Sequence, residues 1–155
     1  MGLDFTLSLA IREKDTKAAK WVIDIAYWRK AWALSHDIVN IVSEPKYAVQ
    51  NDGDFFYVSS TAALYEIADL IKNNISDIEA DYWEDSVFSP TSTRHNSIIQ
   101  LASIYDAIKW LNSPEDDDAF ELMWEDVKKF DSGILEAYLG EKDKYDIVLY
   151  TDYSY

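Results

Sequence analysis

The sequence predicts a single α+β domain over residues 1–155, in which a small, mostly antiparallel sheet packs against about four helices. Apolar residues alternate with polar ones near both ends of the chain, a pattern typical of half-buried strands. Several stretches between these ends repeat apolar residues at helical spacing. The hydrophobic fraction, 48%, indicates a folded chain in spite of its heavy charge.

The first strand is predicted over residues 3–11. The apolar residues of one face are Leu3, Phe5, Leu7, Leu9 and Ile11, and the polar residues of the other are Asp4, Thr6 and Ser8. The segment WVIDI, residues 21–25, is compatible with a short strand or with the entry to a helix, and helix entry by residue 25 is favoured. That helix is expected to end near Val42, because Pro45 disfavours helical geometry in the residue before it.

Residues 25–40 combine aromatic and basic side chains in IAYWRKAWALSHDIVN. On a helix, Tyr27 falls on a buried stripe, and Trp28 and Trp32 fall on a second stripe beside it. Arg29 and His36 face outward, so His36 is expected on the surface. The aromatics are therefore interpreted as core, with Trp28 and Trp32 as the surplus available for an exposed contact.

The middle of the chain predicts a turn, a strand and two helices. Asp52 and Gly53 indicate a turn before a strand at Phe55–Val58. Ser59 and Ser60 are helix N-cap candidates. The apolar stripe of the helix that follows is Leu64, Ile67, Ala68, Ile71 and Ile75. The stripe predicted for the next helix is Ile98, Leu101, Tyr105, Ile108 and Leu111.

The last part of the chain predicts one more helix and a final strand. Ser113 at the N-cap, Pro114 after it and acids across the first turn favour a helix start. The inner face of this helix is predicted to hold Phe120, Met123, Trp124, Val127 and Phe130. After Gly140, YDIVLYTDYSY alternates as a strand.

The charge is strongly negative and unevenly distributed. The formal charge is -15, with seven Lys/Arg against six Asp/Glu in residues 1–50 and seven against 23 in residues 51–155. Such a field repels nucleic acids and anionic membranes and attracts basic proteins. No apolar run approaches 18 residues, so neither a membrane span nor a secretory signal is expected, and cytoplasmic action is favoured.

Motifs for catalysis and cofactor binding are missing from the sequence. Four glycines and no cysteine exclude a phosphate-binding glycine-rich loop, thiolate chemistry and disulfides. His36 and His95 are the only imidazoles, and neither lies in a recognisable catalytic arrangement. We therefore expect no enzyme activity and no cofactor.

Two clusters of carboxylates, the first with interleaved aromatics, are the candidate partner-binding residues. They are Asp77, Glu79, Asp81, Tyr82, Trp83, Glu84, Asp85, Asp116, Asp117, Asp118, Glu121 and Glu125. Acids at a helix N-terminus complement the helix dipole, which accounts for the start of the second cluster. It does not account for Asp117, Glu121 and Glu125, whose like charges repel at i, i+4 and i+8. A solvated helix face, a docking surface for a basic partner and a metal site all remain open.

Carboxylates spaced along a rigid domain can imitate a phosphate backbone and occupy a nucleic-acid-binding groove of another protein. The favoured hypothesis is a non-enzymatic binding protein that engages a basic, nucleic-acid-binding protein, with no direct binding of nucleic acid. One alternative is a metal-assisted hydrolase that uses the carboxylate clusters. The other is a housekeeping protein whose charge serves only solubility.

The motifs MGLDFTL at 1–7, YWRKA at 27–31 and DGDFFYVSS before an amphipathic helix occur in the same order in a group of small bacteriophage proteins. The chain resembles this group over residues 1–7 and 25–112, with YWRKA the most specific match. Trp32 stands where the group has Asn, and His36 falls one position past the histidine of the group, so no role for that residue is carried over. The resemblance implies a phage protein that acts in the cytoplasm of a bacterial host. An anti-CRISPR or anti-restriction inhibitor fits that origin.

Overall fold

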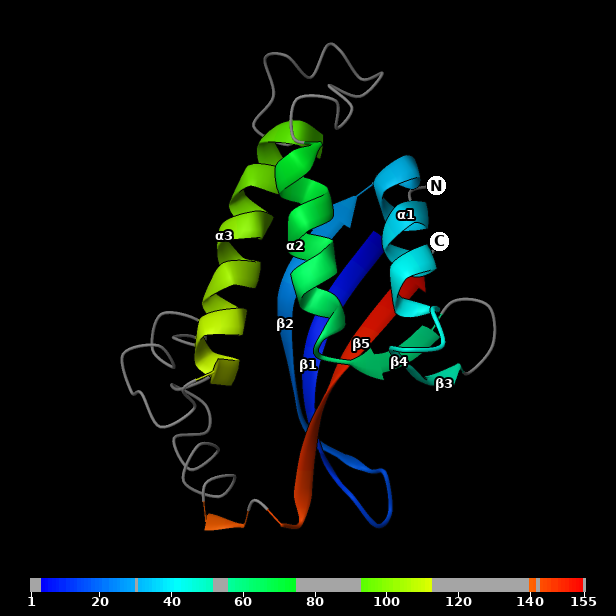
Figure 1. The fold of residues 1–155 in the computed structure, drawn as a ribbon, viewed down its shortest axis with the longest axis vertical. Helices are drawn as coiled ribbons and strands as arrows, with labels where there is room; N and C mark the ends of the chain where they lie inside the picture. Colours follow the sequence, from blue (N-terminus) through cyan, green and yellow to red (C-terminus); the bar gives the residue numbers. More distant parts are fainter. Residues whose placement is uncertain are drawn as a thin grey trace.

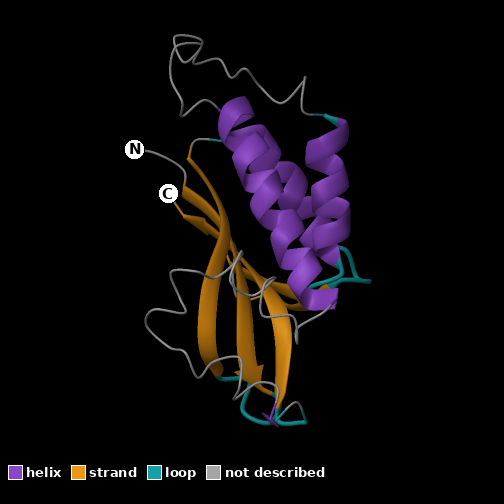
Figure 2. Ribbon diagram, turned by 90° about the vertical axis from the view of Figure 1, so that its left-hand side faces the viewer, coloured by secondary structure: helices purple, strands orange, loops and turns teal. Residues whose placement is uncertain are grey.

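The computed structural model describes residues 4–29, 31–51, 56–74, 93–112, 140–141 and 143–154. In these ranges the chain forms five strands and three helices arranged in two layers (Figures 1 and 2). In chain order they are β1 (Asp4–Glu13), β2 (Ala19–Arg29), α1 (Trp32–Val42), β3 (Ala48–Asn51), β4 (Phe56–Ser60), α2 (Ala63–Asn73), α3 (Thr93–Asn112) and β5 (Tyr145–Ser154). The predicted α+β class is confirmed. The fourth predicted helix, from Ser113, lies outside the described residues.

The sheet has the strand order β2-β1-β5-β4-β3, and each neighbouring pair is antiparallel. The first and last strands therefore lie side by side near its middle, with Leu9 opposite Leu149. The predicted first and final strands and the strand after the Asp-Gly turn are confirmed within a few residues. Strand β3, the partner of β4, was not predicted.

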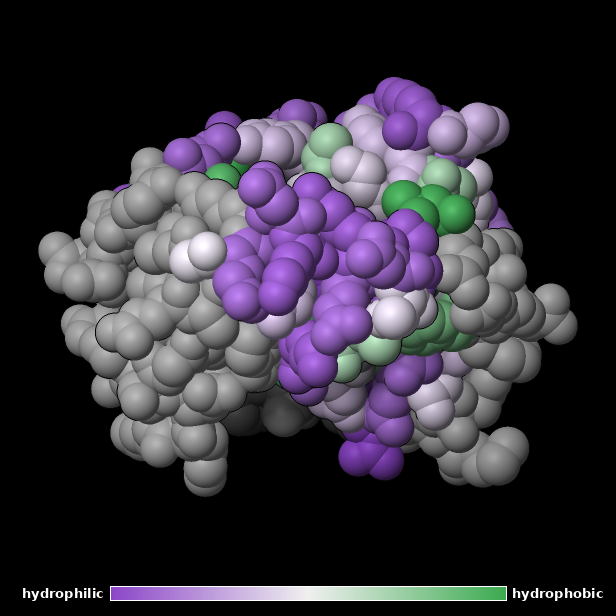
Figure 3. All heavy atoms as spheres, turned by 90° about the horizontal axis from the view of Figure 1, so that it is seen from below, coloured by the Kyte–Doolittle hydropathy of each residue, from purple (hydrophilic) through white to green (hydrophobic). Residues whose placement is uncertain are grey.

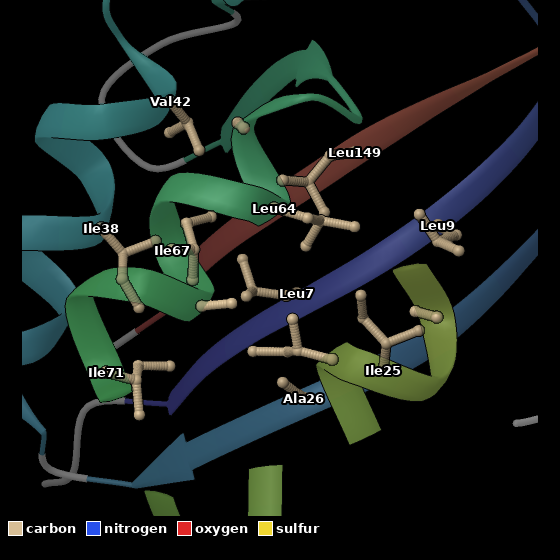
Figure 4. Close-up of a cluster of buried hydrophobic side chains, with 14 of the residues drawn as sticks. Leu7, Leu9, Ile25, Ala26, Ile38, Val42, Leu64, Ile67, Ile71 and Leu149 are labelled. Carbon is tan, nitrogen blue, oxygen red and sulfur yellow. The ribbon is translucent and has the colours of Figure 1, made fainter. Parts of the chain in front are cut away.

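The core lies between one face of the sheet and the three helices (Figure 2). The apolar face predicted for β1 is confirmed, because Phe5, Leu7, Leu9 and Ile11 are all fully buried, but the strand is not half-buried, since Ser8 on the other face is also buried. Figure 4 shows Leu64 and Ile67 of α2 directed toward β1. The predicted stripe of α2 is confirmed for Leu64, Ile67, Ala68 and Ile71. Ile75 lies outside the described residues.

The helix predicted from residue 25 is wrong at its start. Strand β2 continues to Arg29, and α1 begins at Trp32. The reason is a bulge in β2, where Leu7 pairs with Ala26 and Ser8 with Asp24, which leaves Ile25 as an extra residue. The bulge brings Ile25 and Ala26 to the interior together, so the buried residues Ile23, Ile25, Ala26 and Trp28 do not alternate as in a regular strand.

Because residues 27 and 28 lie in a strand, the burial of the two aromatics of YWR is the reverse of that predicted. Trp28, predicted as surplus, is 1% exposed, whereas Tyr27, predicted as core, is 44% exposed. The indole Nε1 of Trp28 donates to Ser97 Oγ of α3 at 3.0 Å. Trp32, at the start of α1, is partly exposed, as predicted, and His36 is exposed as predicted.

Two further helix predictions need correction. Ser59 and Ser60 belong to β4, and α2 begins later, after a turn in which the Ala62 N–H donates to Ser60 Oγ. In α3 the predicted stripe is confirmed for Leu101, Ile108 and Leu111, which pack against the core, but the buried face is rotated away from its other two residues. Ile98 and Tyr105 are exposed, while the fully buried residues are Ser97, Ile104, Ala107 and Trp110.

The rotation of α3 has a physical cause, because this helix packs along β2, an edge strand with unpaired backbone groups. Ser103 Oγ donates to the carbonyl oxygen of Ile25, and the N–H of Tyr27 donates to Gln100 Oε1 at 3.1 Å. With Ser97, these residues form a polar line at i, i+3 and i+6 toward the strand. Polar residues therefore occupy a face that an apolar pattern would have assigned to solvent.

The strand geometry of YWR predicts unequal effects of two truncations. Trp28→Ala should lower the free energy of unfolding by about 3–5 kcal/mol, because it empties a fully buried site. Tyr27→Ala should cost roughly 1 kcal/mol or less, because that side chain is largely exposed. Urea unfolding of the two variants measures both values. Equal losses would contradict the alternation of β2.

Candidate partner-binding surface

All twelve predicted partner-binding residues lie outside the described residues, in segments 75–92 and 113–139. Segment 75–92 contains Asp77, Glu79, Asp81, Tyr82, Trp83, Glu84 and Asp85. Segment 113–139 contains Asp116, Asp117, Asp118, Glu121 and Glu125. Their role as a binding surface stays a prediction, and the structure bears on it through the framework that carries the two segments.

The charge of the protein is concentrated in these two acidic segments. Together they contain 14 Asp/Glu and two Lys/Arg, whereas the described residues contain 13 and 10. The acidic segments therefore carry a formal charge of -12, and the described framework carries only -3. A near-neutral framework has little reason to attract a charged partner by itself.

Helix α3 joins the two acidic segments. Segment 75–92 follows Asn74, at the end of α2, and precedes Thr93, the first residue of α3. Segment 113–139 begins directly after Asn112, the last residue of α3. A helix of 20 residues rises about 30 Å, so the acidic segments leave α3 at points about 30 Å apart (Figure 1).

Exposed apolar side chains lie along α3 between these points. Ile98 is 55% exposed and Tyr105 is 42% exposed. They lie seven residues apart and therefore on one side of the helix, as does Asn112 after another seven. Asn112 Nδ2 donates to the hydroxyl of Tyr65 on α2 at 3.0 Å. We call Ile98, Tyr105 and Tyr65 the α3 strip.

The surface at the turn between β1 and β2 differs from the apolar surface of α3. Its described surface is mostly hydrophilic (Figure 3). The exposed residues of the turn carry charges of both signs, and Lys20 pairs with Glu13 at 3.0 Å. Lys20 and Thr16 lower the pKa of the Glu13 carboxyl through hydrogen bonds to it. Mixed charges of this kind give no net attraction for a partner of either sign.

An ion pair joins the two central strands on the face of the sheet away from the helices. The guanidinium of Arg12, which is almost fully buried, donates from Nε to Asp146 Oδ1 at 2.9 Å. Arg12 and Asp146 lie directly opposite each other in the β1–β5 register. This pair fixes the register of the first and last strands. Arg12 and Asp146 therefore have a structural role.

Within the described ranges, no three His, Asp or Glu side chains are arranged to hold a metal ion. The carboxylate clusters on which the hydrolase alternative depends lie outside those ranges. His36, on the exposed side of α1, lies beside Asn40, with its Nδ1 3.4 Å from Asn40 Nδ2. The side chain of His95 is outside the described part.

Comparisons of this chain with protein-family models, with curated proteins and with solved structures find no match. None of the described helices is long and apolar enough to cross a membrane.

Ser97, Gln100 and Ser103, the residues that place α3 on β2, were not predicted. Their signal is present in the sequence as polar residues at i, i+3 and i+6 in a helix with apolar residues on several sides. The α3 strip was not predicted either, because Ile98 and Tyr105 were assigned to the core. The exposed side of α3 could not be identified without knowing that its polar line faces a strand edge.

An ion-pair cluster of Lys46, Glu44 and Glu66 lies on the framework, and its contribution to stability should depend on pH. Lys46 Nζ lies 2.9 Å from Glu66 of α2 and 3.4 Å from Glu44. The hydrogen bond from Lys46 lowers the pKa of Glu66, and both carboxylates raise the pKa of Lys46. Because the folded-state pKa of Glu66 is depressed, its contribution to stability is present above the unfolded value, about 4.3–4.5, and is lost as the pH falls below it.

We therefore expect Lys46→Met to lower stability at neutral pH and to reduce the loss of stability on acidification through that pH range. Thermal unfolding between about pH 3 and pH 7 measures both effects. The control is Lys72→Met, which removes a different cation, in the last turn of α2. Its stability should depend on pH in the same way as that of the wild type. An unaltered profile in Lys46→Met would contradict the pairing with Glu66.

Proposed function

We propose that this chain is a non-enzymatic, phage-encoded binding protein that inhibits a basic, nucleic-acid-handling or defence protein of the bacterial host. In this proposal the chain acts in the host cytoplasm, in the manner of an anti-CRISPR or anti-restriction protein. The two acidic segments contact the partner in place of a phosphate backbone. The observation that carries the proposal is the segregation of charge, -12 on the acidic segments against -3 on the framework.

The dimensions of the framework support imitation of nucleic acid. Duplex DNA carries one phosphate charge per about 1.7 Å, so a charge of -12 corresponds to about 20 Å of duplex. The ends of α3, about 30 Å apart, approach the separation of roughly 34–36 Å between successive turns of a DNA groove. A protein that binds two adjacent turns of a groove is thus the kind of partner that fits.

The chemistry of the charges supports binding to a basic partner. Carboxylates repel one another and attract Lys and Arg side chains over a Debye length of about 8–10 Å. Steering of this kind accelerates association and makes it sensitive to salt. Phage origin rests on the resemblance of YWRKA and its neighbouring motifs, and inhibition of a host protein follows from binding to its nucleic-acid groove.

The proposal is tested by reversing charge in one acidic segment. The variant Asp116→Lys, Asp117→Lys, Glu121→Lys and Glu125→Lys changes the formal charge from -15 to -7. We expect it to lose at least about tenfold in affinity for the protein that the wild type captures from a bacterial lysate, and to depend less on salt. Mass spectrometry identifies the captured protein, and titration at two salt concentrations measures the affinity.

The matched control reverses four exposed acids of the framework, Asp15, Asp37, Asp143 and Asp152, and reaches the same formal charge. It should retain affinity within about threefold, because the overall charge changes equally but the acidic segments do not. Equal losses in both variants would reduce the effect to net charge alone. Full binding by the first variant would show that the second acidic segment is not the contact surface.

A further inference from the structure

We propose that the face of the sheet away from α1, α2 and α3 carries a docking surface for an arginine-bearing segment of another protein. The surface lies at the end of the sheet where β1 begins and β5 ends. Its residues, which we call the sheet-face surface, are Asp4, Asp24, Tyr27, Phe56, Tyr150 and Asp152. The inference goes beyond the proposed function, because it does not depend on what the acidic segments bind.

The register of the strands places these side chains in two rows on one face. In the first row, Thr6 of β1 lies between Tyr27 of β2 and Asp152 of β5. Asp152 lies in turn opposite Phe56 of β4. Leu7, the next residue of β1, is buried in the core between the sheet and the helices. Because successive side chains of a strand point to opposite faces, the first row points away from the helices (Figure 2).

The second row adds a carboxylate and a ring to the same face. Here Ser8 of β1 lies between Asp24 of β2 and Tyr150 of β5. The Ser8 hydroxyl donates to Asp24 Oδ1 at 2.7 Å, which holds that carboxylate on this face. The ring of Tyr150 packs edge-on against the ring of Phe56, with their centroids 5.0 Å apart. Carboxylates and aromatic rings from four strands therefore share one surface.

The carboxylates of this surface are accessible and outnumber its cations. Asp24 and Asp152 are exposed, and Tyr27 is 44% exposed. Asp4 accepts a hydrogen bond from the Tyr27 hydroxyl, whereas no residue of the described ranges forms a hydrogen bond or ion pair with Asp152. The cation at this end of the face is Arg29, opposite Asp4 in the register. Three carboxylates against one guanidinium favour a cationic occupant.

The rings beside the carboxylates select arginine as that cation. Asp152 lies directly opposite Phe56 and two residues from Tyr150 on the same face, so a guanidinium bound to Asp152 would lie beside both rings. Guanidinium binds carboxylate through two parallel N–H donors and stacks on aromatic faces, whereas the ammonium of lysine is a strongly hydrated point charge. The small net charge of the framework gives little long-range attraction, so recognition on this face is by contact.

The test uses the full chain and a short peptide as the probe. A blocked Gly-Arg-Gly-Arg-Gly peptide is titrated into the ¹⁵N-labelled protein, and the backbone amide signals are followed by NMR. We expect saturable shifts at Tyr27, Tyr150 and Asp152. The same peptide with lysine in place of arginine should bind these positions about threefold or more weakly, because it loses the stacking and the paired donors.

Two double variants separate the surface from net charge. Asp24→Asn with Asp152→Asn removes two charges with little change of shape, and it should weaken binding of the arginine peptide at the sheet face by about fivefold or more. The matched control is Asp15→Asn with Asp37→Asn, which removes the same charge from two exposed framework sites and should bind as the wild type does. Thermal unfolding verifies that both variants fold.

Four results would overturn the inference. They are shifts confined to positions outside the sheet-face surface, full binding by the Asp24 and Asp152 variant, equal losses in the two variants, and equal binding of the lysine peptide. A dimer that forms through this face in sedimentation would make a second copy the occupant instead. Charge reversal at Asp116, Asp117, Glu121 and Glu125, the test of the proposed function, should leave the sheet-face shifts in place, so the two proposals fail separately.

Discussion

The arrangement of the molecule depends on how α3 satisfies the open edge of β2. An edge strand presents unpaired N–H and C=O groups, and the bulge at Ile25 interrupts its regular pairing. Gln100 and Ser103 bind the backbone of Tyr27 and Ile25, while Ser97 accepts the indole N–H of Trp28. These bonds fix both the rotation of α3 about its axis and its position along the strand. They thereby determine which side chains of α3 face solvent.

The described framework combines an apolar core with a small net charge. The core between the sheet and the helices is apolar, and its central strands are joined by the Arg12–Asp146 pair on the other face. The framework is close to neutral. Most of the negative charge belongs to the two acidic segments, one of which directly precedes α3 in the sequence while the other directly follows it. With a formal charge of -3, the framework has little internal charge repulsion. In our proposal the same separation leaves the acids available to a partner.

Much of the fold was predictable from periodicity. The period of two in β1 and β5 and the stripe of α2 were sufficient, because the apolar face of each element packs into the core between the sheet and the helices. The prediction failed where another constraint prevailed. At Ile25 a bulge interrupts the alternation of β2, and on α3 the polar residues bind a strand edge while Ile98 faces solvent. Neither is visible in the sequence without the strand order. The acidic candidates follow from composition alone, and their arrangement in space lies outside the described residues.

The central claim is that the protein occupies a nucleic-acid-binding groove. It is tested most directly by competition between the chain and duplex DNA for the captured partner. The account predicts mutually exclusive binding: DNA displaces the protein, the protein displaces DNA, and no ternary complex forms at any ratio. A stable complex of partner, DNA and protein, with DNA affinity unchanged, would contradict it.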